Sequence, residues 1–420
     1  MGKRIIISGI TDSRNNGCWA MAESTMALFK RHIPEVEFFY LTDERSRDAE
    51  RLAANGRIFF YMPWTVLNIP KVRFLYAYIC ATAICFNLFL MRYLGVNIFF
   101  QNYCRTFREA DLVIDLSGDS ISTDYGDYSV FFQILPLLCA HIIGKPYVFY
   151  AQSIGPFKKG WLYALVKFIL RRASLITARE EITVALLKEQ GIESNVKLTN
   201  DSAFLLEATS VDMTCIKQEF SLSDNKRYIA VSMSGLIGSY LKDESMMPKE
   251  FSKVMAALLD DLIERYDMEI IFIPHVMKKG VDDVSASQQV VGHMRYQGRV
   301  TVMNKDYNGA QFKAVIGMCE CLIACRMHAA IAAVSQCVPT LILAYNHKTH
   351  GIIGRALEMQ DLIIDIRDID IETFKEQIRQ KAAHLIENTD MLKNKLSQPV
   401  NKAKEKSEQN FYLCRELMKW

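Results

Sequence analysis

The chain has 420 residues with a formal net charge of +3, and 50% of its residues are hydrophobic. This length allows two or three globular domains, and a charge this small, without a basic stripe interleaved with aromatic residues, excludes a nucleic-acid partner. The 11 cysteines form no disulfide framework, which indicates a reducing compartment and therefore a cytoplasmic protein.

Apolar runs typical of strands alternate with segments of helical spacing along most of the chain. The first series of expected strands covers residues 4–8, 36–41, 57–61, 112–116, 147–151, 175–177 and 196–198. The second series covers residues 228–232, 269–273, 299–302, 319–324 and 338–343. Strands that alternate with helices pair in parallel through right-handed crossovers. We therefore expect an α/β protein with parallel sheets in two Rossmann-like domains that face a cleft.

The alternation is interrupted between residues 206 and 226, where charged residues accumulate, and this segment is the expected link between the domains. The N-terminal domain then covers residues 1–205 and the C-terminal domain residues 227–390. The remaining tail, residues 391–420, is polar with an apolar stripe at its end, which predicts a helix packed on the fold.

A long uncharged run of apolar residues interrupts the N-terminal domain at residues 74–91, with Lys71, Arg73 and Arg92 on its flanks. Its length is at the lower limit for crossing a bilayer, and Asn87 and Thr82 weaken that interpretation. Three interpretations stay open: a buried helix, a helix lying in the plane of a membrane surface, and a membrane span.

Polar residues follow several of the expected N-terminal strands. Asn16 stands before a helix, in a loop that either caps this helix or cradles an anion. Gly118 allows a ligand close to the backbone, and Asp119 is either a helix cap or a base for a ligand hydroxyl. Gln152 offers a side-chain donor at the end of the next strand.

Two charged residues complete the N-terminal set. Arg179 follows a strand and either pairs with Glu180 or binds an anion through its planar fork. Asp201 is either a helix cap or a carboxylate that faces the ligand.

The C-terminal half carries the most informative block, in which Arg326 and His328 directly follow an apolar strand. Ligands of open α/β sheets bind beyond the carboxyl ends of strands, so a cation and an imidazole at this point predict a site for a phosphate or a carboxylate. Lys348 follows the next strand. His275 with Asp282 and Asp283 resembles a metal set, but substrate contact combined with helix capping is the favoured interpretation, and we expect no metal.

The motifs occur in the order Asn16-Gly17, Asp115-Leu116-Ser117-Gly118-Asp119, Tyr125-Gly126, Gln152-Ser153-Ile154-Gly155-Pro156, Ala178-Arg179-Glu180, Asp201, Pro274-His275, Asp282-Asp283, Arg326-Met327-His328-Ala329 and Lys348-x-x-Gly351. In this order they resemble the polysaccharide pyruvyl transferase family over about residues 5–355. The resemblance implies a GT-B-like pair of Rossmann domains and transfer of pyruvate from phosphoenolpyruvate onto a sugar hydroxyl pair as a ketal, in cell-surface or exopolysaccharide biosynthesis. The family often has a glycine pair or triplet where this chain has a single glycine, Gly118, which leaves the acceptor open.

Phosphoenolpyruvate carries a carboxylate and a phosphate, so its site needs cations, for which Arg326 and Arg179 are the first candidates and Lys348 the third. His328 is the expected acid or phosphate-assisting group. Asp119 is the expected base for the acceptor hydroxyl, with Asp201 as the alternative. Phosphoenolpyruvate is a co-substrate, and no further cofactor is expected.

Two other functions stay open: a nucleotide-sugar-dependent glycosyltransferase of the same architecture, and a non-catalytic binding protein docked at a membrane. The expected partners are phosphoenolpyruvate and a glycan or lipid-linked saccharide acceptor. The basic flanks of residues 74–91 leave peripheral contact with the inner face of the cell membrane as an open alternative to a wholly cytoplasmic location.

Overall fold

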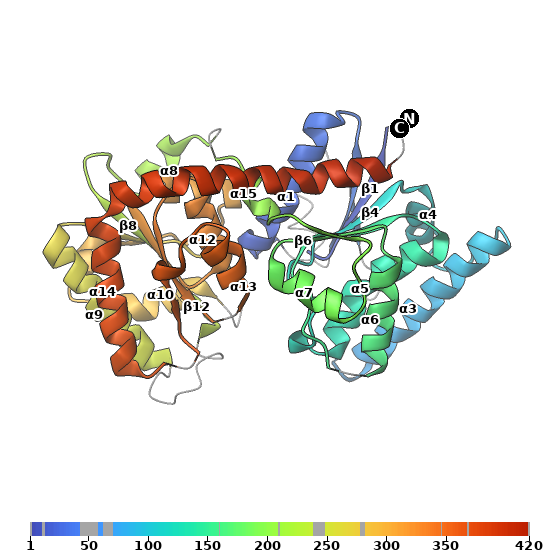
Figure 1. Cartoon of the computed structure of the whole chain (residues 1–420), viewed down its shortest axis with the longest axis horizontal. Coiled ribbons are helices and arrows are strands. Elements are labelled where there is room, and N and C mark those ends of the chain that lie inside the picture. Colours follow the sequence, from blue (N-terminus) through green and yellow to red (C-terminus); the bar gives the residue numbers. More distant parts are fainter. Residues whose placement is uncertain are drawn as a thin grey trace. The chain divides into compact units, whose positions relative to one another are not determined.

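Parallel pairing joins the strands of two separate sheets, as the alternation of strands and helices predicted (Figure 1). The computed structural model describes residues 2–10, 13–42, 58–61, 70–158, 160–208, 211–237, 248–277, 282–345, 347–367 and 369–418. The chain divides into a first unit, Met1–Ser13, Met21–Ser202 and Lys406–Trp420, and a second unit, Arg14–Ala20 and Ala203–Glu405. Each unit contains one sheet.

The first unit holds a seven-stranded sheet in the order β3-β2-β1-β4-β5-β6-β7. Its strands are β1 (Arg4–Ser8), β2 (Glu37–Thr42), β3 (Ile58–Tyr61), β4 (Leu112–Asp115), β5 (Tyr147–Gln152), β6 (Leu175–Ala178) and β7 (Val196–Leu198). Its helices are α3 (Pro70–Tyr93), α4 (Gln101–Glu109), α5 (Asp127–Ile143), α6 (Trp161–Arg172), α7 (Glu181–Glu189) and all but the first turn of α1 (Asn16–His32). Helices α3, α4 and α6 pack against α5.

The second unit holds a six-stranded sheet in the order β10-β9-β8-β11-β12-β13. Its strands are β8 (Tyr228–Ser232), β9 (Glu269–Phe272), β10 (Val300–Val302), β11 (Cys321–Ala324), β12 (Thr340–Ala344) and β13 (Ile363–Asp365). Its helices are α8 (Met213–Phe220), α9 (Pro248–Tyr266), α10 (Asp283–Val291), α11 (Gly309–Gly317), α12 (Met327–Val334), α13 (His347–Thr349), α14 (Ile371–Glu387) and most of α15 (Thr389–Leu417).

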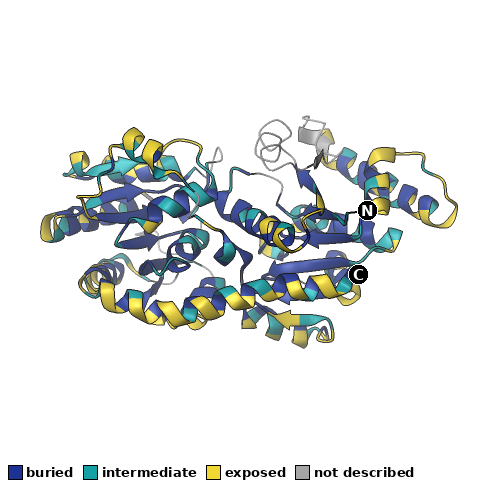
Figure 2. Ribbon diagram, turned by 90° about the horizontal axis from the view of Figure 1, so that it is seen from above, coloured by how far each residue is buried: buried dark blue, intermediate teal, exposed yellow. Residues whose placement is uncertain are grey.

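The central strands are buried on both faces, which explains why they read as continuous apolar runs in the sequence. All residues of β4, β5, β8 and β11 are buried. Figure 2 shows strands inside each unit in the dark blue of buried residues. Helices supply the covering layers, and α5 ends where Gly144 adopts a left-handed conformation with a φ of 79°. A glycine in this conformation is a typical helix end, and Pro146 two residues later cannot continue the helix.

Each sheet reverses its strand order once, between β1 and β4 in the first unit and between β8 and β11 in the second. Loops on either side of such a reversal run in opposite directions and leave a crevice at the carboxyl ends of the strands. The strand order therefore marks one candidate binding position in each unit.

Three segments differ from the expected organisation. The segment expected to be a link, residues 206–226, contains helix α8, capped by the Asp212 side chain. The tail belongs to one continuous helix, α15, whose last turns are grouped with the first unit, and Arg14–Ala20 are grouped with the second. These groupings join segments far apart in the sequence, which local patterns do not reveal.

Candidate active site

A polar cluster in the first unit begins at the switch point between β1 and β4. Asp115, the last residue of β4, is fully buried and accepts a hydrogen bond from the backbone N–H of Ser117 at 3.0 Å. Gln152 at the end of β5 is equally buried. Its amide donates to the Asp115 carbonyl at 2.8 Å and accepts from the Ser117 hydroxyl at 3.1 Å. Both ends of the Gln152 side chain thus hold the loop that leads to Gly118 and Asp119.

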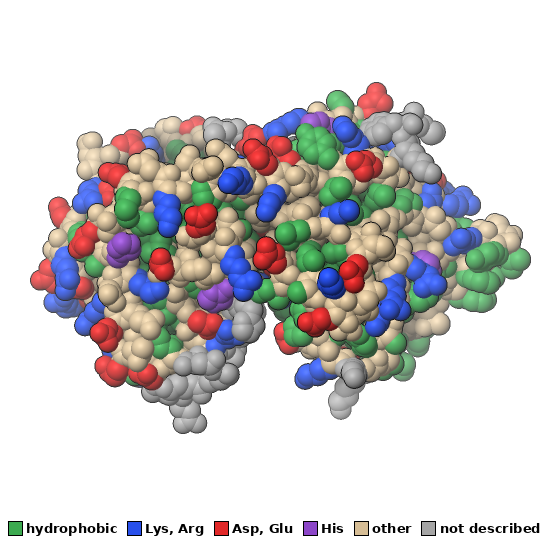
Figure 3. Space-filling model, viewed as in Figure 1, with side chains coloured by type: hydrophobic (Ala, Val, Ile, Leu, Met, Phe, Trp, Pro, Cys, Tyr) green, Lys and Arg blue, Asp and Glu red, His purple; other side chains and the backbone are tan. Residues whose placement is uncertain are grey.

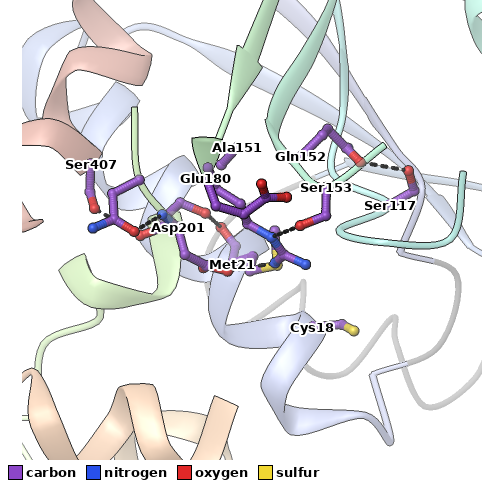
Figure 4. Close-up of polar contacts among 12 residues, drawn as sticks. Cys18, Met21, Ser117, Ala151, Gln152, Ser153, Glu180, Asp201 and Ser407 are labelled. Atoms are coloured by element: carbon purple, nitrogen blue, oxygen red, sulfur yellow. Dashed lines mark hydrogen bonds and ion pairs between the residues drawn. The ribbon is translucent and has the colours of Figure 1, made fainter. Parts of the chain in front are cut away.

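Arg179 joins this cluster from the end of β6. Figure 4 shows its two hydrogen-bond partners, Ser153 and Asp201. Its Nη1 donates to the Asp201 carboxylate at 2.6 Å, and its Nε donates to the Ser153 hydroxyl at 2.8 Å. The exposed fractions of the Arg179 and Asp201 side chains are 1% and 0%. The other partner considered from the sequence, Glu180, instead caps α7 by accepting from the backbone N–H of Thr183. The ion pair therefore connects the end of β6 to the segment after β7.

The Gly118–Asp119 loop lies close to this ion pair, since a Cβ atom at Gly118 would lie 3.9 Å from Nη1 of Arg179. Gly118 has a φ of +69°, and its backbone carbonyl accepts from the Ser153 N–H at 2.7 Å. Burial lowers the pKa of Arg179, but the charges of Asp201 and Asp119 outweigh burial, and the pKa is raised overall. Asp119 is half-buried, in contrast to the fully buried Asp201. The cluster thus combines one partly accessible carboxylate with a fixed guanidinium.

The second unit carries a corresponding arginine at its own switch point. Arg326 directly follows β11, and both its Nε and its Nη2 donate to the Asp283 carboxylate, the latter at 2.5 Å. Asp283 also accepts from the backbone N–H groups of Gly235, His275 and Val276. The exposed fraction is 11% for the Arg326 side chain and 0% for Asp283. Asp283 thus fixes the plane of the Arg326 guanidinium.

The electrostatics of this pair follow from its burial. Burial raises the pKa of the Asp283 carboxyl, against the opposing charge of Arg326. Burial alone lowers the pKa of Arg326, yet the Asp283 charge and a hydrogen bond with Tyr345 raise it overall. Arg326 therefore keeps its positive charge at every physiological pH.

His275 lies within the electrostatic reach of Arg326 and His328. It is buried, its ring stacks on Phe312 with centroids 6.0 Å apart, and burial is the main cause that lowers its pKa to about 3. His275 is therefore neutral near pH 7. Because His275 is neutral, Arg326 can bind an anion without a second positive charge buried next to it.

The first turn of α1 packs against the histidines of the second unit. The Asn16 backbone N–H donates to the His275 carbonyl at 2.9 Å, and Asn15 forms an antiparallel bridge with Val276. A Cβ atom at Gly17 would lie only 2.6 Å from the Cβ of His328. Gly17 is thus needed for close approach to His328, a role that the sequence did not indicate.

Lys348 lies half-buried in the short helix α13, after β12. The same strand end carries Tyr345, whose hydroxyl interacts with Arg326. A cavity of about 280 Å³ is lined by residues that include Ser234, Gly235 and Asp282. The capping expected in this region is made by Asp282 alone, which accepts from the backbone N–H groups of Val284 and Ser285.

The candidate residues from the sequence thus gather in two clusters, one in each unit. The first contains Gly118, Asp119, Gln152, Arg179 and Asp201, and the second contains Asn16, His275, Arg326 and His328. Lys348 belongs to the second unit and follows β12 in α13. Sequence reasoning assigned no role to Asp115 and Ser153, and it considered Asp283 as part of a metal set or of a helix cap with substrate contact, not as the partner of Arg326. The sequence did hold a signal for the role of Asp283. Asp282 alone is enough to cap α10, so a second carboxylate at the next position indicates a different partner.

A family model for polysaccharide pyruvyl transferases matches residues 17–347 of the chain. The chain belongs to this family. Amylovoran biosynthesis protein AmsJ from Erwinia amylovora is 21% identical to this family member over 329 residues, which cover 74% of the chain and 77% of AmsJ. Membership makes the protein a transferase, with a polysaccharide as the implied acceptor.

Solved structures confirm the GT-B-like fold of this family member. The UDP-GlcNAc 2-epimerase from Methanocaldococcus jannaschii matches with a TM-score of 0.61 and 13% identity, covering 99% of this chain and 100% of the epimerase. The enzyme from Neisseria meningitidis, solved with UDP-GlcNAc, matches with a TM-score of 0.60 and 12% identity over 99% of this chain and 100% of that one. At these identities the likeness concerns the fold alone.

Proposed function

We propose that the protein transfers pyruvate from phosphoenolpyruvate onto two hydroxyls of a saccharide as a ketal, with no cofactor besides this co-substrate. The observation that carries the proposal is Arg326, held in a fixed plane by Asp283 at the switch point of the second sheet. A preoriented guanidinium suits the carboxylate or the phosphate of the donor, because its planar fork matches both anions.

The reaction needs a proton donor at the methylene carbon of phosphoenolpyruvate and relief of charge on the departing phosphate. Protonation converts the methylene to a methyl group and makes the central carbon electrophilic. One acceptor hydroxyl then adds, the bond to the phosphate oxygen breaks, and a second hydroxyl closes the ketal. One hydroxyl proton replaces the proton given to the methyl group, and the other leaves with inorganic phosphate. His328 is the proposed acid, and Arg326 the charge stabiliser.

Asp119 is the proposed base for the acceptor hydroxyl. Asp119 is half-buried, whereas Asp201 is fully buried and paired with Arg179 at 2.6 Å. A base must lie within hydrogen-bond reach of the hydroxyl that it deprotonates, and this favours the accessible carboxylate. Arg179 then supports the charge of Asp119, and Asp201 positions Arg179.

The test measures phosphate release from phosphoenolpyruvate in the presence of a glycan or lipid-linked acceptor fraction, with mass spectrometry for the added pyruvyl group. We expect Arg326→Ala and His328→Ala to lose at least ~100-fold in turnover, the usual scale for removing a charge stabiliser or a positioned acid. Arg265→Ala, at an exposed arginine of α9, is the matched control and should stay near wild type.

Donor binding is measured separately, as the rise in melting temperature that phosphoenolpyruvate causes in the purified protein. The wild type and Arg265→Ala should show this rise, and Arg326→Ala should not. Near-normal ketal formation by both site variants would contradict the residue roles. Release of a nucleoside diphosphate from a nucleotide sugar, without phosphate release from phosphoenolpyruvate, would contradict the function.

A further inference from the structure

Helix α3 has two apolar faces, and only one of them is buried in the first unit. The buried face contains Ala77, Cys80, Ala81, Ile84, Leu88 and Met91, which belong to the hydrophobic core. The opposite face contains Leu75, Ile79, Phe86, Phe89 and Tyr93, with exposed fractions between 50% and 64%. A soluble helix normally places polar residues on its outer face. The exposed side of α3 is therefore an apolar surface without a partner among the described residues.

The loop after α3 extends this surface and is held in a fixed shape. Leu94, Val96, Ile98 and Phe99 are exposed. The fully buried Asn87 side chain accepts from the Ile98 backbone N–H at 2.7 Å and donates to the Phe99 carbonyl at 2.7 Å. The apolar loop is thus tied to α3 by a polar residue in the middle of the helix. Figure 3 shows the hydrophobic side chains gathered at the right-hand edge of the view, where Figure 1 places α3.

The segment that carries this surface is basic, although Glu109 directly follows it and Asp127 lies within electrostatic reach of Tyr78 on α3. The charged residues between Pro70 and Arg108 are Lys71, Arg73, Arg92, Arg105 and Arg108, without a single acidic residue. Arg92, Arg105 and Arg108 are exposed. Apolar side chains bordered by arginines match the interface of a membrane that contains anionic lipids, where the apolar groups enter the headgroup boundary and the cations contact phosphates.

We propose that this surface, the exposed face of α3 together with residues 94–99, docks the protein in the plane of an anionic lipid membrane. The interpretation as a membrane span is disfavoured, although α3 is long and apolar enough to cross a bilayer. Crossing would expose the buried face of α3 and remove Ile84 and Leu88 from the core. Docking in the plane leaves the core intact.

A second copy of the chain fits this surface less well. An interface between two copies would bring two basic segments together, and residues 70–108 of neither copy supply an acidic partner. Like charges at an interface are repulsive, whereas anionic headgroups neutralise them. Charge complementarity therefore selects a lipid surface as the occupant.

The experiment is co-sedimentation of the full chain with vesicles of phosphatidylcholine alone or mixed with phosphatidylglycerol. We expect strong binding to the mixed vesicles, at least ~10-fold weaker binding to phosphatidylcholine, and a loss of binding with added salt. The variant Ile79→Ser/Phe86→Ser/Phe89→Ser should lose at least ~10-fold in binding to the mixed vesicles. Arg105→Gln/Arg108→Gln should lose binding to the mixed vesicles and keep the weak binding to phosphatidylcholine.

The matched controls lie outside the surface. Met391→Ser changes a side chain of α15 that is 54% exposed, and Arg265→Gln changes an exposed arginine. Both should bind vesicles like the wild type, and an unchanged melting temperature shows that each variant is folded. Absence of binding to the mixed vesicles, or equal binding by the serine variant, overturns the proposal. A dimer in light scattering that the serine variant dissociates, without vesicle binding, identifies a second copy as the occupant and also overturns it.

Discussion

At the scale of single residues, the two arginines of the clusters share one design. Arg179 is held by Asp201 and Arg326 by Asp283, and both carboxylates are fully buried. Each pair fixes the position of its arginine. Removing one partner would leave a buried charge uncompensated and would destabilise the fold. Asp115 differs, because its Oδ2 has no hydrogen-bond partner among the described residues, and burial raises its pKa to about 7.

The protonation of Asp115 gives a pH-dependent prediction. Its folded-state pKa of about 7 lies above the ordinary 3.8, so the folded chain holds a proton that the unfolded chain has released. This contribution to stability is present at acid pH and is lost as the pH rises toward 7. We expect Asp115→Asn to raise the melting temperature, relative to the wild type, more at about pH 8 than at about pH 5.

Calorimetry of both proteins at the two pH values checks this expectation. Asp267→Asn, at a side chain that is 91% exposed, is the matched control and should show no such change with pH. A difference between Asp115→Asn and the wild type that is the same at both pH values would contradict the prediction.

At the scale of elements, helix α3 combines a core helix with an outward apolar face, and Asn87 connects the two roles. Sequence reasoning counted Asn87 as a residue that weakens a membrane span. In the structure Asn87 holds the loop after α3, because its side-chain oxygen accepts from Ile98 and its nitrogen donates to Asn97 and Phe99. An amide inside an apolar helix is retained where a loop needs its hydrogen bonds.

Asn87→Ala should therefore lower the free energy of unfolding by about 1–3 kcal/mol, because it leaves the buried partners of the amide unsatisfied. Hydrogen exchange at the Ile98 N–H should become faster in the same variant. Thr82→Ala is the matched control on α3, since the Thr82 hydroxyl is exposed and donates only to the Tyr78 carbonyl of its own helix. Denaturant unfolding and exchange rates equal to those of the wild type would show that Asn87 does not hold the loop.

At the scale of the whole molecule, the last turns of α15 complete the first unit. The Ser407 hydroxyl donates to the Asp201 carbonyl, although 206 residues separate the two. Asn410 donates to the Asn200 carbonyl and accepts from Thr199, each within 2.9 Å. The segment that holds the partner of Arg179 is thus itself held by the C-terminal helix.

Asn410→Ala should lower both stability, by about 1–3 kcal/mol, and phosphate release from phosphoenolpyruvate, because the loop of Asp201 loses two buried contacts. Lys402→Ala, at an exposed position of the same helix, is the control and should change neither. Activity that stays at the wild-type level while stability falls would show that α15 supports the fold without positioning the site.

The sequence by itself determined the class of the fold and the strand ends that carry polar residues. Every expected strand is present, and the central ones were recognised because a strand buried on both faces must be apolar along its whole length. The edge strand β13 was not expected from the sequence. Arg179, His275, Arg326 and His328 were recognised in the same way, since the change from apolar to charged residues at a strand end is a local signal.

Only the tertiary structure decided which of these residues meet. The strand order placed the switch points between β1 and β4 and between β8 and β11, and with them Asp115 and the pair Arg326–Asp283. The tertiary structure also groups the start of α1 with the second unit and leaves one apolar face of α3 exposed. The physical reason is that the spacing of hydrophobic residues and the turn residues determine structure over only a few neighbouring positions. The partner of a buried charge is instead determined by packing between segments tens to hundreds of residues apart.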